Sequence, residues 1–177
     1  MFCQECTVTI AHMMIQQTAD VLIRVLGLEG HIEGGYFREV YRSPFQVDTS
    51  GDEERALSTV IYFLLRSGQF SAFHRLRSDE LWLYHCGCPL RVYQMLPDGG
   101  CTSALMGHDV ASGQQLQVLF PAGAYFAAEP AEEGAFALVS CVVSPGFDYR
   151  DFELASAEEL LRMFPGEEAL IHRLCCK

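Results

Sequence analysis

The sequence has little positive charge. Its 177 residues include 12 Lys and Arg against 23 Asp and Glu, which gives a formal net charge of -11 at pH 7. Nucleic acid phosphates and anionic membrane surfaces would repel such a chain. The composition therefore predicts neither a nucleic-acid partner nor a membrane partner, and we interpret the acidic surface as a solubility feature.

Long apolar runs are also missing. No segment approaches the roughly 20 apolar residues that a membrane-spanning helix requires. The N-terminal segment has neither the basic region nor the hydrophobic region of a secretory signal, so we expect a cytoplasmic protein. Because there is no repeat, low-complexity segment or linker, we expect an irregular leader over residues 1–15 and a single domain over 16–177.

Cysteine, by contrast, is abundant, with eight residues in the chain. Cys3 and Cys6 have CxxC spacing, and Cys175 and Cys176 are adjacent. Neither pair has the nearby turn residues that are typical of a structural zinc knuckle. Without a secretory signal we expect reduced thiols that mostly fill the core, and metal binding by the cysteines is the minor alternative.

The hydrophobic pattern is mostly that of short strands. Roughly ten strand-like segments are separated by Gly and Pro turns, whereas helical spacing occurs only near the two ends. A helix is predicted over 16–26 with Gly27 as its cap, and a helical tail is predicted over 156–174. The polar residues 46–56 are predicted to form a loop. This pattern predicts an all-β antiparallel sandwich or barrel with short terminal helices, and it excludes a parallel α/β fold.

One segment, 71–87, combines charged residues with an apolar strand pattern. His74 ends a short strand, a charged turn follows, and Glu80 shares a face of the next strand with Trp82 and Tyr84. We expect His74 and Glu80 to face each other across a tight β-turn. Because buried charges must be paired, coordinated or neutralised, this pair is the predicted centre of the functional site.

The same segment resembles the first motif of the cupin superfamily. That motif has the form H-x-H-x3-E-x6-G, and His74, Leu76, Glu80 and Gly87 align with its defined positions. The spacing of the histidine, the glutamate and the glycine fits in full, whereas leucine replaces the second histidine.

The second cupin motif is similar to the segment that contains Pro121 and Gly123, where Phe126 occupies the position of the metal-binding histidine. Residues 26–154 as a whole resemble a small single-domain family, the fifth-type cupins. The segments that carry this resemblance are HIEGGYFREVYRS, FHRLRSDELW, FPAGAYFAAE and SPGFDYRDFEL. The resemblance implies a β jelly roll and a homodimer, and it implies no settled activity.

The departures from the cupin motifs bear on metal binding. A typical metal-binding cupin uses three histidines and a glutamate, of which this chain keeps His74 and Glu80. Two protein ligands are too few for a tight divalent-metal site. We therefore expect no cofactor, and the alternative is a divalent metal on His74 and Glu80 whose coordination shell is completed by Glu33 or water.

Three residues of the segment are assigned catalytic roles. His74 is the predicted general base, because an unperturbed imidazole pKa near 6.5 suits proton transfer at neutral pH. Glu80 would orient the imidazole, and Tyr84 is the candidate acid. The structural alternatives are a core histidine with a satisfied hydrogen bond and a salt bridge from Glu80 to Arg75 or Arg77.

Other residues are assigned to ligand binding. Trp82, Tyr125 and Phe126 would line a pocket inside the jelly roll, and Glu33 would add a second carboxylate at its mouth. Arg38 is the candidate anion clamp. The alternatives are core packing for the aromatic residues, a purely structural turn beside Glu33, and a solvated face for Arg38.

These residues support three hypotheses for function. The first is a metal-independent isomerase or epimerase that acts on a sugar-like or keto substrate. The second is a non-catalytic cupin that binds an unidentified small molecule. The third is a metallocupin with a reduced set of ligands.

Overall fold

A computed structural model describes residues 18–49, 54–96 and 99–176. The predicted leader, including Cys3 and Cys6, lies outside the described residues. Among the helices that are described, none is long and apolar enough to cross a membrane. The strands run from Glu29 to Leu154, and helices flank them on both sides in the sequence.

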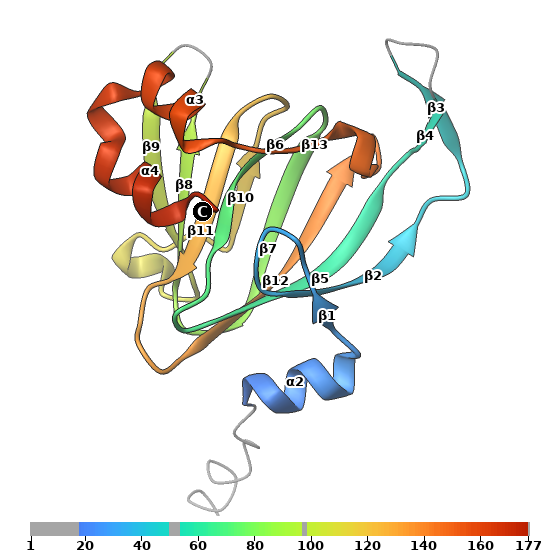
Figure 1. The fold of residues 1–177 in the computed structure, drawn as a ribbon. Coiled ribbons are helices and arrows are strands. Elements are labelled where there is room, and N and C mark those ends of the chain that lie inside the picture. Colours follow the sequence, from blue (N-terminus) through green and yellow to red (C-terminus); the bar gives the residue numbers. More distant parts are fainter. Residues whose placement is uncertain (1–17, 50–53, 97–98, 177) are drawn as a thin grey trace, which may run out of the picture.

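Two antiparallel sheets pack face to face as a jelly-roll sandwich, which confirms the predicted fold class (Figure 1). The first sheet has six strands in the order β1 (Glu29–Gly30), β2 (Tyr36–Arg42), β5 (Thr59–Arg66), β12 (Phe136–Ser144), β7 (Asp79–Gly87) and β10 (Gln117–Phe120). The second has five strands in the order β13 (Phe152–Leu154), β6 (Ser71–Leu76), β11 (Tyr125–Pro130), β8 (Leu90–Met95) and β9 (Cys101–Met106). Residues on the inner faces alternate with outward-facing residues, as the period-two pattern requires.

The predicted polar loop over 46–56 is wrong in part. Strands β3 (Gln46–Asp48) and β4 (Glu54–Ala56) pair with each other as a separate two-stranded sheet. This arm projects from the sandwich beyond the end of β2 (Figure 1). Sequence periodicity missed the arm because its strands are three residues long and carry few apolar residues.

The described helices are short, and the predicted caps Gly27 and Ser156 are present. Helix α2 (Ala19–Leu26) begins at Thr18, whose Oγ1 accepts from the Val21 amide, and it ends at Gly27 with φ 62°. Helices α3 (Ala157–Met163) and α4 (Glu168–Leu174) form the C-terminal tail, and the Ser156 hydroxyl accepts from the Glu159 amide. Short 3₁₀ turns lie at η1 (Val110–Ser112), η2 (Tyr149–Asp151) and η3 (Pro165–Glu167).

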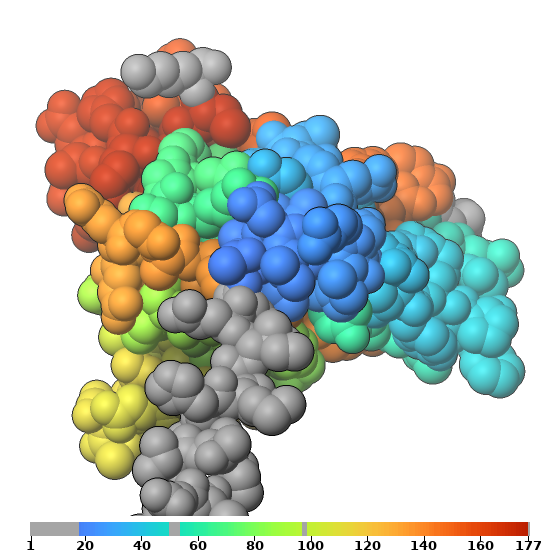
Figure 2. Space-filling view, turned by 90° about the horizontal axis from the view of Figure 1, so that it is seen from below, coloured from blue at the N-terminus to red at the C-terminus, as the bar shows by residue number. Residues whose placement is uncertain are grey.

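Three apolar clusters hold these layers together. The first fills the space between the two sheets and includes Phe63, Trp82 and Phe126. The second packs α3 and α4 against the outer face of the five-stranded sheet. The third packs α2 against part of the outer face of the six-stranded sheet. Viewed from below, the blue segment with α2 and β1 lies between the red C-terminal helices and the cyan β3–β4 arm (Figure 2).

Candidate functional site

A cavity of about 530 Å³ lies between the two sheets. Its polar inner residues are His31, Glu33, His74, Glu80 and Cys141. Its apolar walls come from both sheets, and charged residues of β1, β2 and the segment before η2 line the remaining part. The apolar and outer lining residues are Glu29, Phe37, Glu39, Arg42, Thr59, Ile61, Leu76, Val143, Phe147, Asp148, Tyr149 and Phe152. A cavity of this size accommodates a small metabolite.

His74 and Glu80 reach this cavity from opposite sheets, which corrects the predicted β-turn pairing. Strand β6, which carries His74, pairs with β11 and β13. Strand β7, which carries Glu80, pairs with β12 and β10. The turn between β6 and β7 therefore carries the chain from one sheet to the other, and the two side chains line the cavity from its two sides.

Glu33 is fully inside the cavity and next to His74. Its Oε2 is 3.2 Å from His74 Nε2 and 3.5 Å from His31 Nδ1, and the Ser71 hydroxyl donates to its Oε1 at 2.8 Å. The sequence analysis placed Glu33 at the pocket mouth and did not identify His31 or Ser71. The adjacent His31, Ile32 and Glu33 carried no strand or helix periodicity that would have indicated a shared face.

A tight turn positions Glu33 against β6. The Ala72 amide donates to the Glu33 carbonyl at 2.8 Å, and the Gly34 amide donates to the His31 carbonyl at 3.2 Å. Gly34 has φ 111°, and a Cβ at this position would lie 2.1 Å from the Phe70 carbonyl oxygen. Only glycine adopts this conformation at such a close approach, so Gly34 is required for the placement of Glu33.

The hydrogen bonds of His74 determine which nitrogen faces Glu33. His74 Nδ1 lies 2.7 Å from the Ala72 carbonyl oxygen, which can only accept a hydrogen bond. Nδ1 therefore carries a proton, and in the neutral imidazole Nε2 is the acceptor that faces Glu33. The protonated carboxyl group of Glu33 can therefore donate a hydrogen bond to Nε2 inside the buried site.

Glu80 has different partners from those expected. Its Oε1 accepts a hydrogen bond from Trp82 Nε1 at 2.8 Å, and it shares a second hydrogen bond with the Cys141 thiol. The alternative of a salt bridge to Arg75 or Arg77 is wrong. Arg75 pairs with Glu153 at 2.8 Å, and Arg77 lies 3.7 Å from Asp151.

Burial favours the uncharged forms of the four central residues. It is the largest cause that raises the pKa of Glu33 and the pKa of Glu80, each to about 7. It is also the largest cause that lowers the pKa of His31 and the pKa of His74. Near neutral pH the cavity therefore contains neutral imidazoles beside carboxyl groups that are close to half protonated.

Trp82 and Phe126 lie in the core next to the site and are not among the cavity-lining residues. Both are 1% exposed. The Phe126 ring lies 4.1 Å from the His74 ring and stacks on Phe120, so it fixes the position of the imidazole. Trp82 contacts the site through its hydrogen bond to Glu80.

The structure places Tyr84, Tyr125 and Arg38 outside the cavity, contrary to expectation. Tyr84 donates to the Gly87 carbonyl at 2.7 Å, and its position four residues beyond Glu80 corresponds to about 13 Å along the strand. Tyr125 lies on the outer face of β11, where its hydroxyl donates to Glu159. Arg38 donates to the Leu26 carbonyl at the end of α2. Adjacent strand residues face opposite ways, so Tyr125 and Phe126 could not both face inward.

The residues present do not fit the metal site that the cupin motifs imply. Leu76 lines the cavity with an apolar side chain, and Phe126 is packed in the core at the third histidine position. Within the described part of the chain, no group of three or more His, Cys, Asp or Glu residues is arranged to hold a metal ion.

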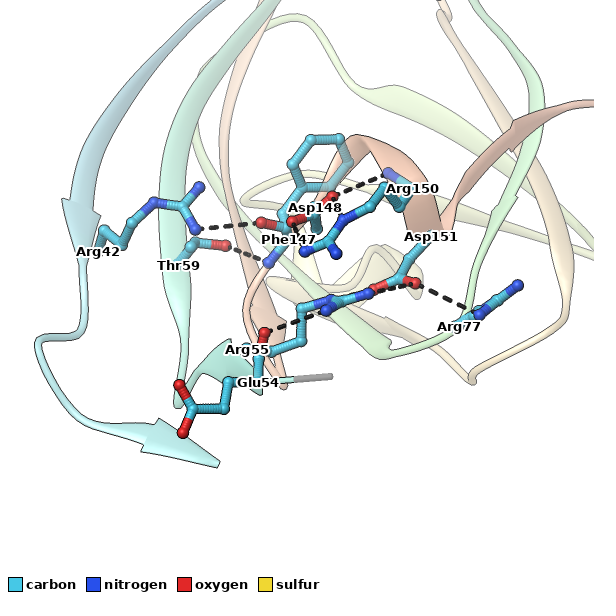
Figure 3. A network of polar contacts seen from close by, with 9 residues as sticks. All are labelled: Arg42, Glu54, Arg55, Thr59, Arg77, Phe147, Asp148, Arg150 and Asp151. Atoms are coloured by element: carbon cyan, nitrogen blue, oxygen red, sulfur yellow. Dashed lines mark hydrogen bonds and ion pairs between the residues drawn. The ribbon is translucent and has the colours of Figure 1, made fainter. Parts of the chain in front are cut away.

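A network of polar contacts includes residues that line the outer part of the cavity, among them Arg42 and Asp148 (Figure 3). Arg42 donates two hydrogen bonds to Glu39 and a third to the Phe147 carbonyl. Asp148 accepts from the Arg150 side chain at 2.9 and 2.8 Å, and these hydrogen bonds hold the pKa of Asp148 well below its usual range. The charges of Arg42 and Asp148 are therefore already neutralised within the protein.

The comparisons with known proteins identify one family model that covers most of the chain. The sequence profile of a family described as Cupin superfamily (DUF985) matches residues 20–155. The uncharacterized protein YML079W of Saccharomyces cerevisiae is 34% identical over 153 residues, which cover 78% of this chain and 75% of the yeast protein.

Solved structures show the same fold. A hypothetical protein from Leishmania major has a TM-score of 0.85 and 39% identity, over 91% of this chain and 100% of that chain. Protein SO0799 from Shewanella oneidensis has a TM-score of 0.84 and 45% identity, over 91% of this chain and 99% of that chain. Oxalate decarboxylase from Bacillus subtilis matches with a TM-score of 0.52 and 20% identity, over 82% of this chain and 36% of that chain, which is a likeness of fold alone.

Proposed function

The chain belongs to the cupin superfamily, in the family described as DUF985, and we propose that its cavity is the site of a metal-independent proton-transfer reaction. The reaction type is that of an isomerase or epimerase, and the substrate class is a sugar-like or keto compound. The observation that carries the proposal is the contact between Glu33 Oε2 and His74 Nε2, 3.2 Å apart in a buried cavity.

The residues can supply both the base and the acid. The Glu33 carboxylate takes the proton from a carbon next to a substrate carbonyl and passes it to the neutral His74 Nε2, 3.2 Å away, while the electron pair of the broken C–H bond forms the C=C bond of an enol. Glu80, with a pKa of about 7, donates a proton to the carbonyl oxygen. In isomerisation, the first proton then adds to the former carbonyl carbon, and Glu80 takes the proton of the hydroxyl on the neighbouring carbon, which becomes the new carbonyl. In epimerisation, a proton returns to the original carbon from the opposite face, and Glu80 takes back the proton it donated.

Glu33 takes the role that the sequence analysis gave to Glu80. It contacts His74 directly and stabilises the imidazolium that forms when His74 accepts a proton. Glu80 replaces Tyr84 as the proposed acid, because Tyr84 lies beside Gly87 and outside the cavity-lining set.

A non-catalytic ligand-binding role is the second candidate. It is favoured by the apolar walls of the cavity, which suit recognition of a small molecule without any chemical step. A metallocupin role receives no support from the described residues, because they do not form a metal cluster.

Isotope exchange tests the proposed reaction. Aldoses, ketoses and keto acids would be incubated with the protein in deuterium oxide, and deuterium next to the carbonyl would be measured by NMR and mass spectrometry. We expect the wild type to catalyse exchange with at least one compound, and we expect His74→Gln and Glu80→Gln to lower its rate by about 100-fold or more.

Glu168→Gln, on the exposed surface of α4, is the matched control and should leave the exchange rate unchanged. Exchange at the background rate in the wild type, together with saturable binding that His74→Ala weakens, would establish the ligand-binding role in its place.

A further inference from the structure

The interior of the cavity contains two buried carboxyl groups without a matching cation. Glu33 and Glu80 are each 6% exposed, and neither forms an ion pair with arginine or lysine among the described residues. Arg42 is the one arginine or lysine among the described residues that line the cavity. Its guanidinium already bonds to both carboxylate oxygens of Glu39.

The walls of the cavity add aromatic rings. Phe37 and Phe152 both lie beside His31, with ring centroids 4.6 and 6.2 Å from the imidazole. Phe147 and Tyr149 meet edge to face at 5.0 Å in the segment that carries Asp148. Aromatic faces carry a negative quadrupole that attracts ammonium groups, most strongly in sites from which water is excluded.

We propose that the ligand of this cavity is a small molecule that carries an ammonium group, and that Glu33 and Glu80 recognise this group. An amino sugar or an amino ketone has this chemistry. The inference rests on the proposed function, because it names the substrate class of the same site.

Two electrostatic arguments favour this ligand class. A buried cation loses its hydration and requires a paired anion, which the two carboxyl groups provide. An anionic ligand would instead lie beside those carboxyl groups with no unengaged cation among the lining residues described. A sugar linked to a nucleoside diphosphate is therefore a poor match.

Binding of an ammonium group should also release protons. A cation beside Glu33 and Glu80 stabilises the ionised form of one carboxyl group, which is only partly populated near neutral pH because burial raises each pKa to about 7, and repulsion between the two keeps the proton on the other. The imidazoles of His31 and His74 and the thiol of Cys141 are the other titratable groups inside. Their neutral forms are favoured by burial, so the carboxyl groups are the expected source of the protons.

Three sugars that share one ring and differ in charge test the inference, namely glucosamine, glucose and glucuronate. Binding to the full chain would be measured by titration calorimetry at neutral pH in two buffers with different heats of ionisation. We expect glucosamine to bind about 10- to 100-fold more tightly than glucose, with proton release, and glucuronate to bind most weakly. Equal binding of the three, a preference for glucuronate, or no glucosamine binding at tens of millimolar would overturn the inference.

Variants of Glu33 and Glu80 test whether their carboxyl groups cause the preference for glucosamine over glucose. Glu33→Gln and Glu80→Gln should each reduce the preference for glucosamine over glucose by about 10-fold, because glutamine keeps the shape and removes the charge. Glu168→Gln should leave the preference unchanged, and a circular dichroism melt would verify that each variant folds. An unchanged preference in both cavity variants would contradict the inference. Binding of glucosamine without isotope exchange would refute the proposed reaction and leave this inference intact.

Discussion

Glu33 and Glu80 have the least usual environments among the carboxyl groups described. Both side chains are almost fully buried, and their hydrogen-bond donors are the Ser71 hydroxyl, the Trp82 indole and the Cys141 thiol. Desolvation penalises the charged form more than these hydrogen bonds stabilise it, so each pKa rises to about 7 from its usual value of 4.5. The fold therefore favours the protonated acids, and this preference links stability to pH.

Glu80→Gln should stabilise the protein at high pH. The folded state holds the Glu80 proton up to about pH 7, whereas the unfolded state releases it near pH 4.5, so this residue's contribution to stability falls as the pH rises between these values. We expect the variant to match the wild type at about pH 5 and to exceed its free energy of unfolding at about pH 8 by up to about 3 kcal/mol. Urea unfolding at the two pH values measures the difference.

The two histidines of the cavity determine how stability changes as the pH falls. Burial lowers the pKa of His31 and the pKa of His74, so protonation of these residues removes stability as the pH falls below 6.5. At about pH 8 the imidazoles are neutral in both proteins, whereas at lower pH the variant also lacks the Glu80 charge that raises the pKa of His74. If the free energies of unfolding of the wild type and Glu80→Gln differed by the same amount at about pH 5 and about pH 8, Glu80 would be ionised in the folded state at both pH values.

At the scale of elements, one buried ion pair connects the β3–β4 arm to the outer part of the cavity (Figure 3). Arg55 on β4 donates to both carboxylate oxygens of Asp151 in η2, at 2.7 and 3.1 Å. Their side chains are 3% and 10% exposed. Arg77 approaches the same carboxylate at 3.7 Å. The arm is thereby held beside the segment that lines the cavity.

Arg55→Ala should lower the free energy of unfolding by about 3–5 kcal/mol, because it leaves the Asp151 carboxylate buried without its main partner. Chemical denaturation measures this loss. Arg75→Ala removes the exposed pair with Glu153 and should cost less than about 1 kcal/mol, since water screens that pair. If the two variants lost similar amounts of unfolding free energy, burial would not make the Arg55–Asp151 pair more stabilising than the exposed Arg75–Glu153 pair.

At the scale of the whole molecule, a row of apolar residues crosses the outer face of the six-stranded sheet. The strand registers place Leu119 opposite Leu81, Leu81 opposite Val142, Val142 opposite Val60, and Val60 opposite Tyr41. Leu119 and Tyr41, at the ends of the row, are 51% and 47% exposed. The apolar cluster that includes α2 contains none of these five residues. A row of this kind is typical of a surface that binds another protein.

We propose that this row forms the interface of a homodimer, as the resemblance to the fifth-type cupins implied. Sedimentation equilibrium should give a mass twice that of the 19.8 kDa chain. Leu119→Glu introduces a charge at the row and should shift the protein toward the monomer. Val25→Glu, at an exposed position on α2, is the control and should leave the mass unchanged. A monomeric wild type would refute the proposal.

The sequence by itself determined most of the elements and the faces of most side chains. Period-two alternation predicted the strands of an antiparallel sandwich or barrel, and Gly27 ended a helix because glycine adopts the left-handed conformation without a steric cost. The same alternation placed His74 and Glu80 at the cavity and could have placed Tyr125 outside it, since adjacent strand residues face opposite sides. These properties depend on residues that are neighbours in the chain, so local patterns reveal them.

Only the tertiary structure decided which of these side chains meet. Glu33 lies beside His74 because a glycine turn docks against β6, a contact between segments far apart in the sequence. His74 and Glu80 face each other across two sheets because β6 and β7 pair with different strands. Tyr84 shares a face of β7 with Glu80 but lies too far along the strand to reach the cavity. Periodicity in the sequence gives the face of a residue and not its distance from a site. Strand pairing and register fix these distances, and both arise from packing across the whole chain.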